Sequence, residues 1–140
     1  MTNVSTGQNI MSTKSVQLSA IGQIAINVHD LEKATAFYRN TLGMELIFQV
    51  PGLMSFFDCG GIRLMLGIPT SPEDDHPSSV IYYRVADIHE SHEALKAKGV
   101  HFSQNPHSVG QMGDIDVWMA FFEDVDGNTL AIMSEVPINE

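Results

Sequence analysis

Two arginines are the side chains best suited to hold a charged small molecule. Arg63 and Arg84 each lie in a run of apolar residues, and a guanidinium group offers paired N–H donors that match a carboxylate or a phosphate. The alternative is that each arginine forms an ion pair within the chain, with an acidic residue such as Asp58 or Asp116. The sequence leaves both roles open.

His107 is the best placed of the six histidines for acid or base chemistry. It falls within residues 105–114, a segment with two glycines as candidate hinges. We expect this segment to be a loop that closes over a ligand and carries His107 to it. His89 and His92 lie three residues apart on a predicted helix, but no third ligand accompanies them, so we expect no metal site there.

The elements that must position these residues repeat along the chain. Residues 24–31 (IAINVHDL) and 81–88 (IYYRVADI) both predict an alternating strand that leads into a helix. An aspartate stands at each predicted helix start, and a glycine followed by an apolar residue stands near each helix end. The repeat therefore predicts two copies of one structural module. The repeated residues are Asp30 and Asp87 at the starts and Gly43 and Gly99 at the ends.

Each module continues with three predicted strands, so its order is strand, helix, strand, strand, strand. The fold class is α+β, with two βαβββ modules that form a curled, cup-shaped, eight-stranded mixed sheet. The three strands cover residues 44–50, 53–59 and 62–68 in the first module and 100–104, 116–122 and 129–133 in the second. We expect a flexible tail at 1–17 and a single domain at 18–137, with modules at about 20–68 and 79–135 and a linker at 69–78.

Strand alternation divides the sheet residues between two faces. One face is apolar throughout and should pack against the helices, whereas the other is mixed and should line the cup as a small-molecule site. The alternative is that the mixed face is solvated or covers a dimer interface. Side-chain direction is ambiguous only for Trp118, whose strand register the sequence does not fix. The predicted ligand-binding residues are Gln23, Asn27, Arg63, Met65, Tyr82, Arg84, Trp118 and Ala131.

Two segments of the chain resemble a known family. Residues 21–44 (IGQIAINVHDLEKATAFYRNTLGM) resemble the opening of glyoxalase I and its relatives, and residues 122–128 (FEDVDGN) resemble their closing turn, with Val125 in place of the usual proline. The chain is therefore identified as a member of the vicinal oxygen chelate superfamily, which includes glyoxalases, bleomycin resistance proteins and dioxygenases. This resemblance implies a homodimer and leaves open whether two chains share one cup.

The resemblance also implies where a catalytic metal would bind. Carried over by spacing, the four ligand positions of the family fall on Gln23, Met65, Val80 and Ala131. Hard divalent ions and zinc prefer carboxylate oxygen or imidazole nitrogen, and only the glutamine amide offers a comparable atom. We therefore expect no metal and no other cofactor.

The charge composition of the chain limits the kinds of molecule that it can bind. The formal net charge is −10 with only 7 Lys and Arg, which disfavours binding to nucleic acid or to an anionic membrane. The single cysteine, Cys59, cannot form an internal disulfide, and the first residues lack the pattern of a secretory signal, so we expect a cytoplasmic protein.

The sequence favours a metal-independent protein of the bleomycin-resistance type that binds a small organic molecule, anionic or aromatic, in the cup. The alternative is a lyase or isomerase, either dependent on a metal or metal-free with His107 as a catalytic residue. Enzyme activity stays open, and the sequence does not name the ligand.

Overall fold

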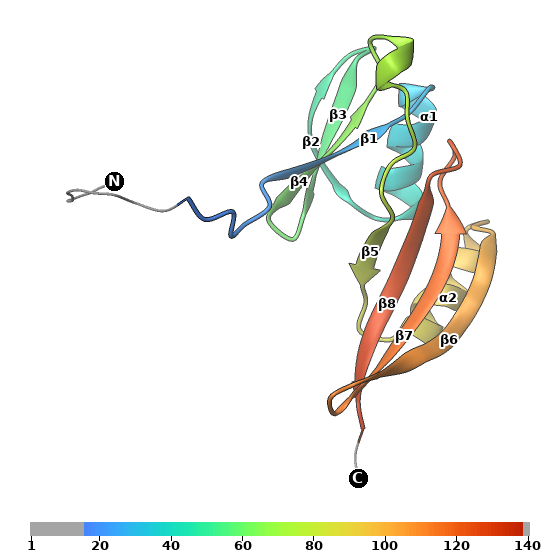
Figure 1. Cartoon of the computed structure of the whole chain (residues 1–140). Helices are drawn as coiled ribbons and strands as arrows, with labels where there is room; N and C mark the ends of the chain where they lie inside the picture. The colour runs from blue at the N-terminus through green and yellow to red at the C-terminus, as the bar shows by residue number, and fades with distance from the viewer. Residues whose placement is uncertain (1–15, 139–140) are drawn as a thin grey trace.

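The computed structural model describes residues 16–138 and shows two modules of the same design (Figure 1). Most of the predicted tail, residues 1–15, lies outside the described residues. The first module comprises β1 (Gln23–Asn27), α1 (Leu31–Ala36), a π-helical turn (Phe37–Thr41), β2 (Glu45–Val50), β3 (Met54–Cys59) and β4 (Ile62–Gly67). A linker with a short 3-10 helix (Pro72–Asp74) leads to β5 (Ile81–Arg84), α2 (Ile88–Ala97), β6 (Phe102–Met112), β7 (Ile115–Glu123) and β8 (Thr129–Pro137).

Each module forms a mixed four-stranded sheet. The strand orders are β1-β4-β3-β2 and β5-β8-β7-β6, and in each sheet the first and last strands of the module pair in parallel. The predicted fold class is thereby confirmed. Within residues 16–138 the hydrogen bonds form two sheets of four strands rather than one of eight, because β1 and β5 are both edge strands.

The predicted helix boundaries are confirmed by the capping geometry. The Asp30 carboxylate accepts from the backbone N–H of Lys33, and the Asp87 carboxylate accepts from the N–H groups of His89 and Glu90. These bonds satisfy amide groups that the first turn of a helix cannot. Past the helix ends, the two predicted glycines have φ angles of 76° and 95°, a left-handed conformation that favours glycine.

The core lies between the helices and one face of each sheet, as the alternation predicts. It joins both modules, so the sheets share one apolar interior. Its fully buried members include Ile26, Val28, Tyr38, Phe57, Leu66, Phe122 and Leu130. No helix within residues 16–138 is long and apolar enough to cross a membrane.

One predicted loop is a strand. Residues 105–114 were expected to form a mobile cover, but β6 continues from Phe102 to Met112 and pairs with β7. The β6–β7 pairing contains three irregularities, and Pro106 and Gly110 lie at two of them. A bulge lets a strand continue past residues that would interrupt a regular ladder of hydrogen bonds. The prediction of a closing loop is therefore wrong, and His107 lies on a paired strand.

A buried carboxylate joins the two modules. The Asp124 side chain accepts hydrogen bonds from the Tyr38 hydroxyl at 2.7 Å and from the backbone N–H groups of Asp126 and Asn128 at 2.9 Å. The Asn128 amide donates to the same carboxylate and to the backbone carbonyl of Asn27. The turn between β7 and β8 is thus fixed to the end of β1 and to the first helical segment.

Candidate functional site

Three of the predicted ligand-binding residues lie together on the open face of the first sheet. Gln23 stands opposite Arg63 in the β1–β4 pairing, and Met65 is two residues further along β4. The Arg63 Nε donates to the Gln23 side-chain oxygen at 2.7 Å, and the Gln23 amide lies 3.9 Å from the Met65 sulfur. Gln23 therefore orients the guanidinium group of Arg63.

Two phenylalanines extend this face, and we call Phe48 and Phe56 the aromatic shelf. Their rings are stacked with centroids 6.1 Å apart, and the Arg63 guanidinium carbon lies 5.7 Å from the Phe56 ring centre. Phe48 is 60% exposed, which is unusual for a large apolar side chain. The shelf, Gln23, Arg63 and Ile47 enclose a groove of about 420 Å³, a size that suits a small organic molecule.

The sequence analysis missed the aromatic shelf. Its position depends on an irregularity in the β2–β3 pairing between Leu46 and Phe48, which changes the side of the sheet on which the following residues of β2 lie. A one-residue change of register moves every later side chain to the opposite face. The only signal in the sequence is the aromatic pair Phe56 and Phe57, of which one must face away from the core.

The two arginines differ in their partners. Arg84 forms an ion pair with Glu135 at 3.4 Å, so the alternative of an ion pair within the chain holds for it, though with a different acid from those considered. Asp58 stands opposite Arg63 in the β3–β4 pairing, yet among residues 16–138 no carboxylate lies within ion-pair distance of Arg63. The charge of Arg63 is therefore not neutralised by an ion pair within the described part of the chain, so the guanidinium can bind an anionic ligand.

The open face of the second sheet holds another group of predicted residues. Tyr82 is paired with Ala131, and the Tyr82 and Phe121 rings pack edge to face with their centroids 5.9 Å apart. Met119 and Met133 are paired on the same face and make its floor apolar. In the described part of the chain, no hydrogen bond or ring contact links this group to Gln23 and Arg63, so one chain presents two separate open faces.

His107 belongs to the second open face, where it is paired with Met119. Its Nδ1 lies 2.7 Å from the Asn105 carbonyl oxygen, and a carbonyl can only accept, so Nδ1 carries the proton. The neutral imidazole then has its lone pair at Nε2, the form that a general base requires.

Two predicted residues have structural roles instead. Trp118 lies on the helix face of β7, against the core and in contact with the His89 ring, and its indole N–H donates to Asp116. Its assignment to the cup is therefore wrong, because the register of β7 places it on the same side as Ala120 and Phe122. The Asn27 amide donates to the backbone carbonyls of Asp74 and His76, which fastens the linker to β1.

The residues at the four metal positions of the family do not fit a metal ion. The Gln23 amide faces a thioether, and Val80 and Ala131 have no donor atom. Within residues 16–138, no three side chains among histidine, cysteine, aspartate and glutamate lie close enough together to hold a metal.

The pKa shifts have clear physical causes. Burial raises the pKa of the Tyr38 hydroxyl well above its usual range, and the neighbouring Asp124 carboxylate raises it further. At one end of β1, the hydrogen bond to Asp75, followed by that to Asp126, raises the pKa of His29 above its ordinary value. Neither group lies on an open sheet face, so these shifts belong to the framework of the fold.

Comparison with known proteins agrees with this architecture. A relative in Bacillus subtilis (strain 168), "Uncharacterized protein YurT", is 29% identical over 131 residues, which cover 79% of this chain and 95% of YurT. A superfamily member from Sphaerobacter thermophilus DSM 20745 has a TM-score of 0.68 and 29% identity, over 84% of this chain and 98% of its own. TnmS3, an antibiotic binding protein from Streptomyces sp. CB03234, has a TM-score of 0.70 and 24% identity, over 86% and 99% of the two chains.

A family model settles the relationship. The model described as "Glyoxalase/Bleomycin resistance protein/Dioxygenase superfamily" matches residues 20–132, which span both modules and the linker. The match includes the two strand-to-helix repeats and the turn around Asp124. This chain belongs to the glyoxalase/bleomycin resistance protein/dioxygenase superfamily.

Proposed function

We propose that this protein binds a small aromatic anion on the open face of the first sheet, without a metal. The observation that carries the proposal is Arg63, an exposed guanidinium without a carboxylate partner in the described chain, held by Gln23 beside an aromatic ring. Paired N–H donors next to a flat apolar surface suit a ring that carries a carboxylate.

The composition of the groove supports an aromatic ligand. Ile47 and Phe48 are 51% and 60% exposed, so a planar molecule that covers them removes apolar area from water. Phe48 and Phe56 both line the groove, so their stacked rings offer a ligand ring an aromatic surface to pack against. The name of TnmS3 shows that a protein of this fold binds an antibiotic, which favours a binding function for this chain as well.

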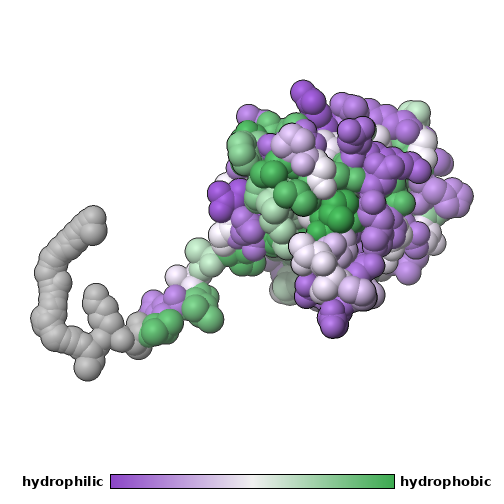
Figure 2. Space-filling view, turned by 90° about the horizontal axis from the view of Figure 1, so that it is seen from above, coloured by the Kyte–Doolittle hydropathy of each residue, from purple (hydrophilic) through white to green (hydrophobic). Residues whose placement is uncertain are grey.

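We propose further that two chains pair and share the cup, so that the second sheet of one chain covers the first sheet of the other. The apolar groups on the two open faces match in kind, with Phe48 on one and Tyr82 on the other. Seen from above, apolar surface gathers on the body and along the start of the described chain (Figure 2).

We place the protein in the cytoplasm, because its single cysteine cannot form an internal disulfide.

The test is calorimetry with benzoate and 2-naphthoate. We expect 2-naphthoate to bind more tightly, because its second ring covers more of the aromatic shelf. Arg63→Gln should weaken binding about 10- to 100-fold, the range for loss of a charge-assisted hydrogen bond. Phe48→Ala should weaken it about 5- to 20-fold.

The matched control is Arg39→Gln, which removes another exposed cation, outside both open faces. It should leave the affinity unchanged. Equal affinity of the wild type and Arg63→Gln for 2-naphthoate would contradict the proposed site.

Metal independence is tested by elemental analysis. Protein purified without a chelator and then exposed to Ni²⁺, Zn²⁺, Mn²⁺ or Fe²⁺ should hold far less than one ion per chain after desalting, because the four family positions offer at most one suitable atom. One tightly held ion per chain would overturn this proposal and favour the lyase alternative.

A second candidate is a metal-free lyase or isomerase with His107 as base. It is favoured by the hydrogen bond from Nδ1 to Asn105, which leaves Nε2 free on an open sheet face. Turnover that survives a chelator and is lost in His107→Ala would establish this activity. Turnover that persists in His107→Ala would exclude His107 from it.

A further inference from the structure

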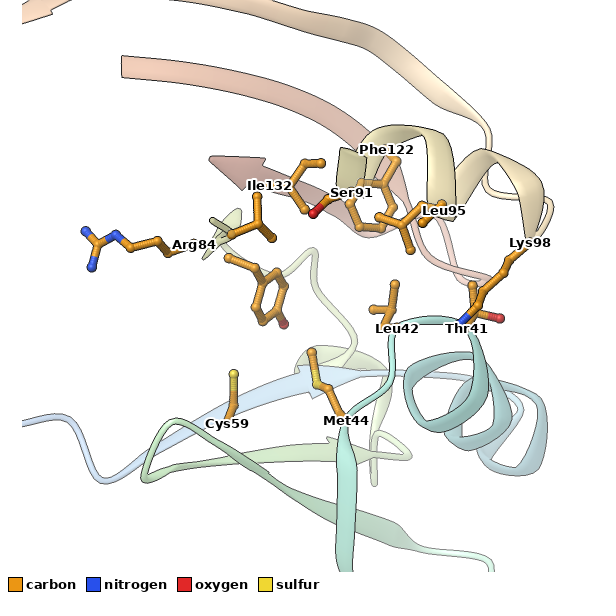
Figure 3. Close-up of a pocket in the computed structure, with 13 residues that line it drawn as sticks. Thr41, Leu42, Met44, Cys59, Arg84, Ser91, Leu95, Lys98, Phe122 and Ile132 are labelled. Atoms are coloured by element: carbon orange, nitrogen blue, oxygen red, sulfur yellow. The ribbon is translucent and has the colours of Figure 1, made fainter. Parts of the chain in front are cut away.

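A second cavity lies on the other side of the second sheet, where the two modules meet. It has a volume of about 370 Å³, and we call it the seam cavity. Its apolar lining comes from both modules, with Leu42 and Met44 from the first and Leu95, Phe122 and Ile132 from the second (Figure 3). It is distinct from the proposed aromatic-anion site, which lies on the open face of the first sheet.

The seam cavity contains an unsatisfied polar group. Tyr83 lines it, and the Tyr83 hydroxyl is buried without a hydrogen-bond partner among residues 16–138. A buried hydroxyl without a partner is costly, and such groups are normally satisfied by the protein, by water or by a ligand. Burial also raises the pKa of Tyr83, so the hydroxyl keeps its proton and is available as a donor.

The rest of the lining limits the charge of a ligand. Cys59 and Met44 turn their sulfur atoms toward the space, while the Arg84 guanidinium points away from it (Figure 3). Lys98 lies at one end beside Thr41 and donates to the Asn40 carbonyl, so it closes that end by joining the modules. The cavity therefore offers neutral donors in an apolar surrounding, and among them the Tyr83 hydroxyl is the one that is buried without a partner, whereas Thr41 and Ser91 add further hydroxyls to the lining.

From these observations we infer that the seam cavity binds a neutral one- or two-ring molecule with a carbonyl oxygen that accepts from the Tyr83 hydroxyl. A cavity of about 150 Å³ with apolar walls is enough for benzene, so 370 Å³ accommodates two fused rings. Of the two cations that line the cavity, Arg84 points away from it and Lys98 donates to the Asn40 carbonyl at one end, which favours a ketone or ester over a carboxylate.

The test uses a fluorescent naphthalene ketone, 6-propionyl-2-(dimethylamino)naphthalene, whose emission moves to shorter wavelength in apolar surroundings. We expect saturable binding with a blue shift. Tyr83→Phe should weaken binding about 5- to 10-fold through loss of one hydrogen bond. Ser79→Ala is the control, since it removes an exposed hydroxyl that lines neither the seam cavity nor the groove of the first sheet, and it should bind as the wild type does.

Two further measurements localise the probe. Ala94→Phe, at an exposed helix position that lines the cavity, should fill the space and weaken binding more than tenfold even if Tyr83→Phe proves unstable. The chain has one cysteine, so alkylation by iodoacetamide reports on Cys59 alone, and saturating probe should slow it. Because burial raises the pKa of the Cys59 thiol, alkaline buffer is needed for a measurable rate.

The two sites can fail independently. Loss of probe binding in Phe48→Ala or Arg63→Gln, with unchanged binding in Ala94→Phe, would place the probe on the first sheet and overturn the seam site. Absence of any blue shift, or an unchanged rate of Cys59 alkylation, would overturn it as well. Neither result bears on 2-naphthoate, whose binding should be unaffected by Ala94→Phe.

Discussion

At the scale of single residues, one histidine connects three segments. The His29 ring lies between two carboxylates, with Nδ1 2.9 Å from Asp126 and Nε2 2.9 Å from Asp75. These groups belong to the end of β1, the β7–β8 turn and the linker. Both aspartates raise the pKa of His29 above its ordinary value of 6.5, Asp75 by the larger amount. When it is protonated, the ring therefore holds the linker against the body of the protein by two ion pairs.

This contact predicts a pH-dependent contribution to stability. A histidine whose folded-state pKa is raised stabilises the protein fully below its unfolded-state pKa, and the effect is lost as the pH rises through the folded-state value. His29→Gln should therefore lower the urea midpoint more at about pH 6 than at about pH 9. His101→Gln, at an exposed histidine without an ion pair among the described residues, should show no such difference. An equal loss at both pH values would contradict the prediction.

At the scale of elements, the β7–β8 turn holds the modules together. The Asp124 carboxylate is buried, and it accepts from the turn itself and from Tyr38 of the first module. A buried carboxylate is tolerated only when hydrogen bonds replace its water. The turn motif that identifies the family thus has a structural role in this chain, as the anchor between two sheets.

Tyr38→Phe tests this role. The ring stays in the core, but Asp124 loses one hydrogen bond, so the free energy of unfolding should fall by about 1–3 kcal/mol in urea denaturation. Tyr82→Phe removes an exposed hydroxyl and should change stability by less than about 0.5 kcal/mol. Similar losses in the two variants would mean that the Tyr38 hydroxyl does not stabilise the junction.

At the scale of the whole molecule, each of the two sheets has an exposed aromatic side chain on its open face. Phe48 and Tyr82 are 60% and 45% exposed, and they lie on different sheets. In the proposed dimer, the second sheet of the partner chain forms the other wall of the cup. A shared cup would add Tyr82 and Arg84 of one chain to the groove around Arg63 of the other.

The proposed shared cup predicts both the mass of the protein in solution and the effect of variants of Tyr82 and Arg84 on ligand affinity. Light scattering after gel filtration should give twice the 15.4 kDa mass of one chain. The Phe48→Asp variant should give the mass of a single chain, because a carboxylate in the interface is costly to bury.

Tyr82→Ala and Arg84→Ala should weaken 2-naphthoate binding by about 3- to 10-fold with little change in melting temperature. A wild type that is monomeric would remove the basis for the shared cup, while leaving the Arg63 site intact.

Local patterns account for what the sequence predicted correctly. Alternation of apolar residues, the caps at Asp30 and Asp87 and the two C-terminal glycines depend on neighbours within a few residues, so the modules and the core face followed from the printed sequence. The residue types at the four metal positions can also be read from the sequence once the family resemblance is given, while metal independence itself stays a prediction. The alternation also placed Gln23, Arg63 and Met65 on one face, as the pairing of β1 and β4 shows, while their role in binding stays a prediction.

Long-range pairing decided the rest. The irregularity before Phe48 and those in β6 change the strand register, and they are set by contacts with distant strands, so the aromatic shelf, the side of Trp118 and the strand around His107 required the tertiary structure. The unpartnered Tyr83 hydroxyl is likewise a property of packing, because only the meeting of the two modules leaves a cavity beside it.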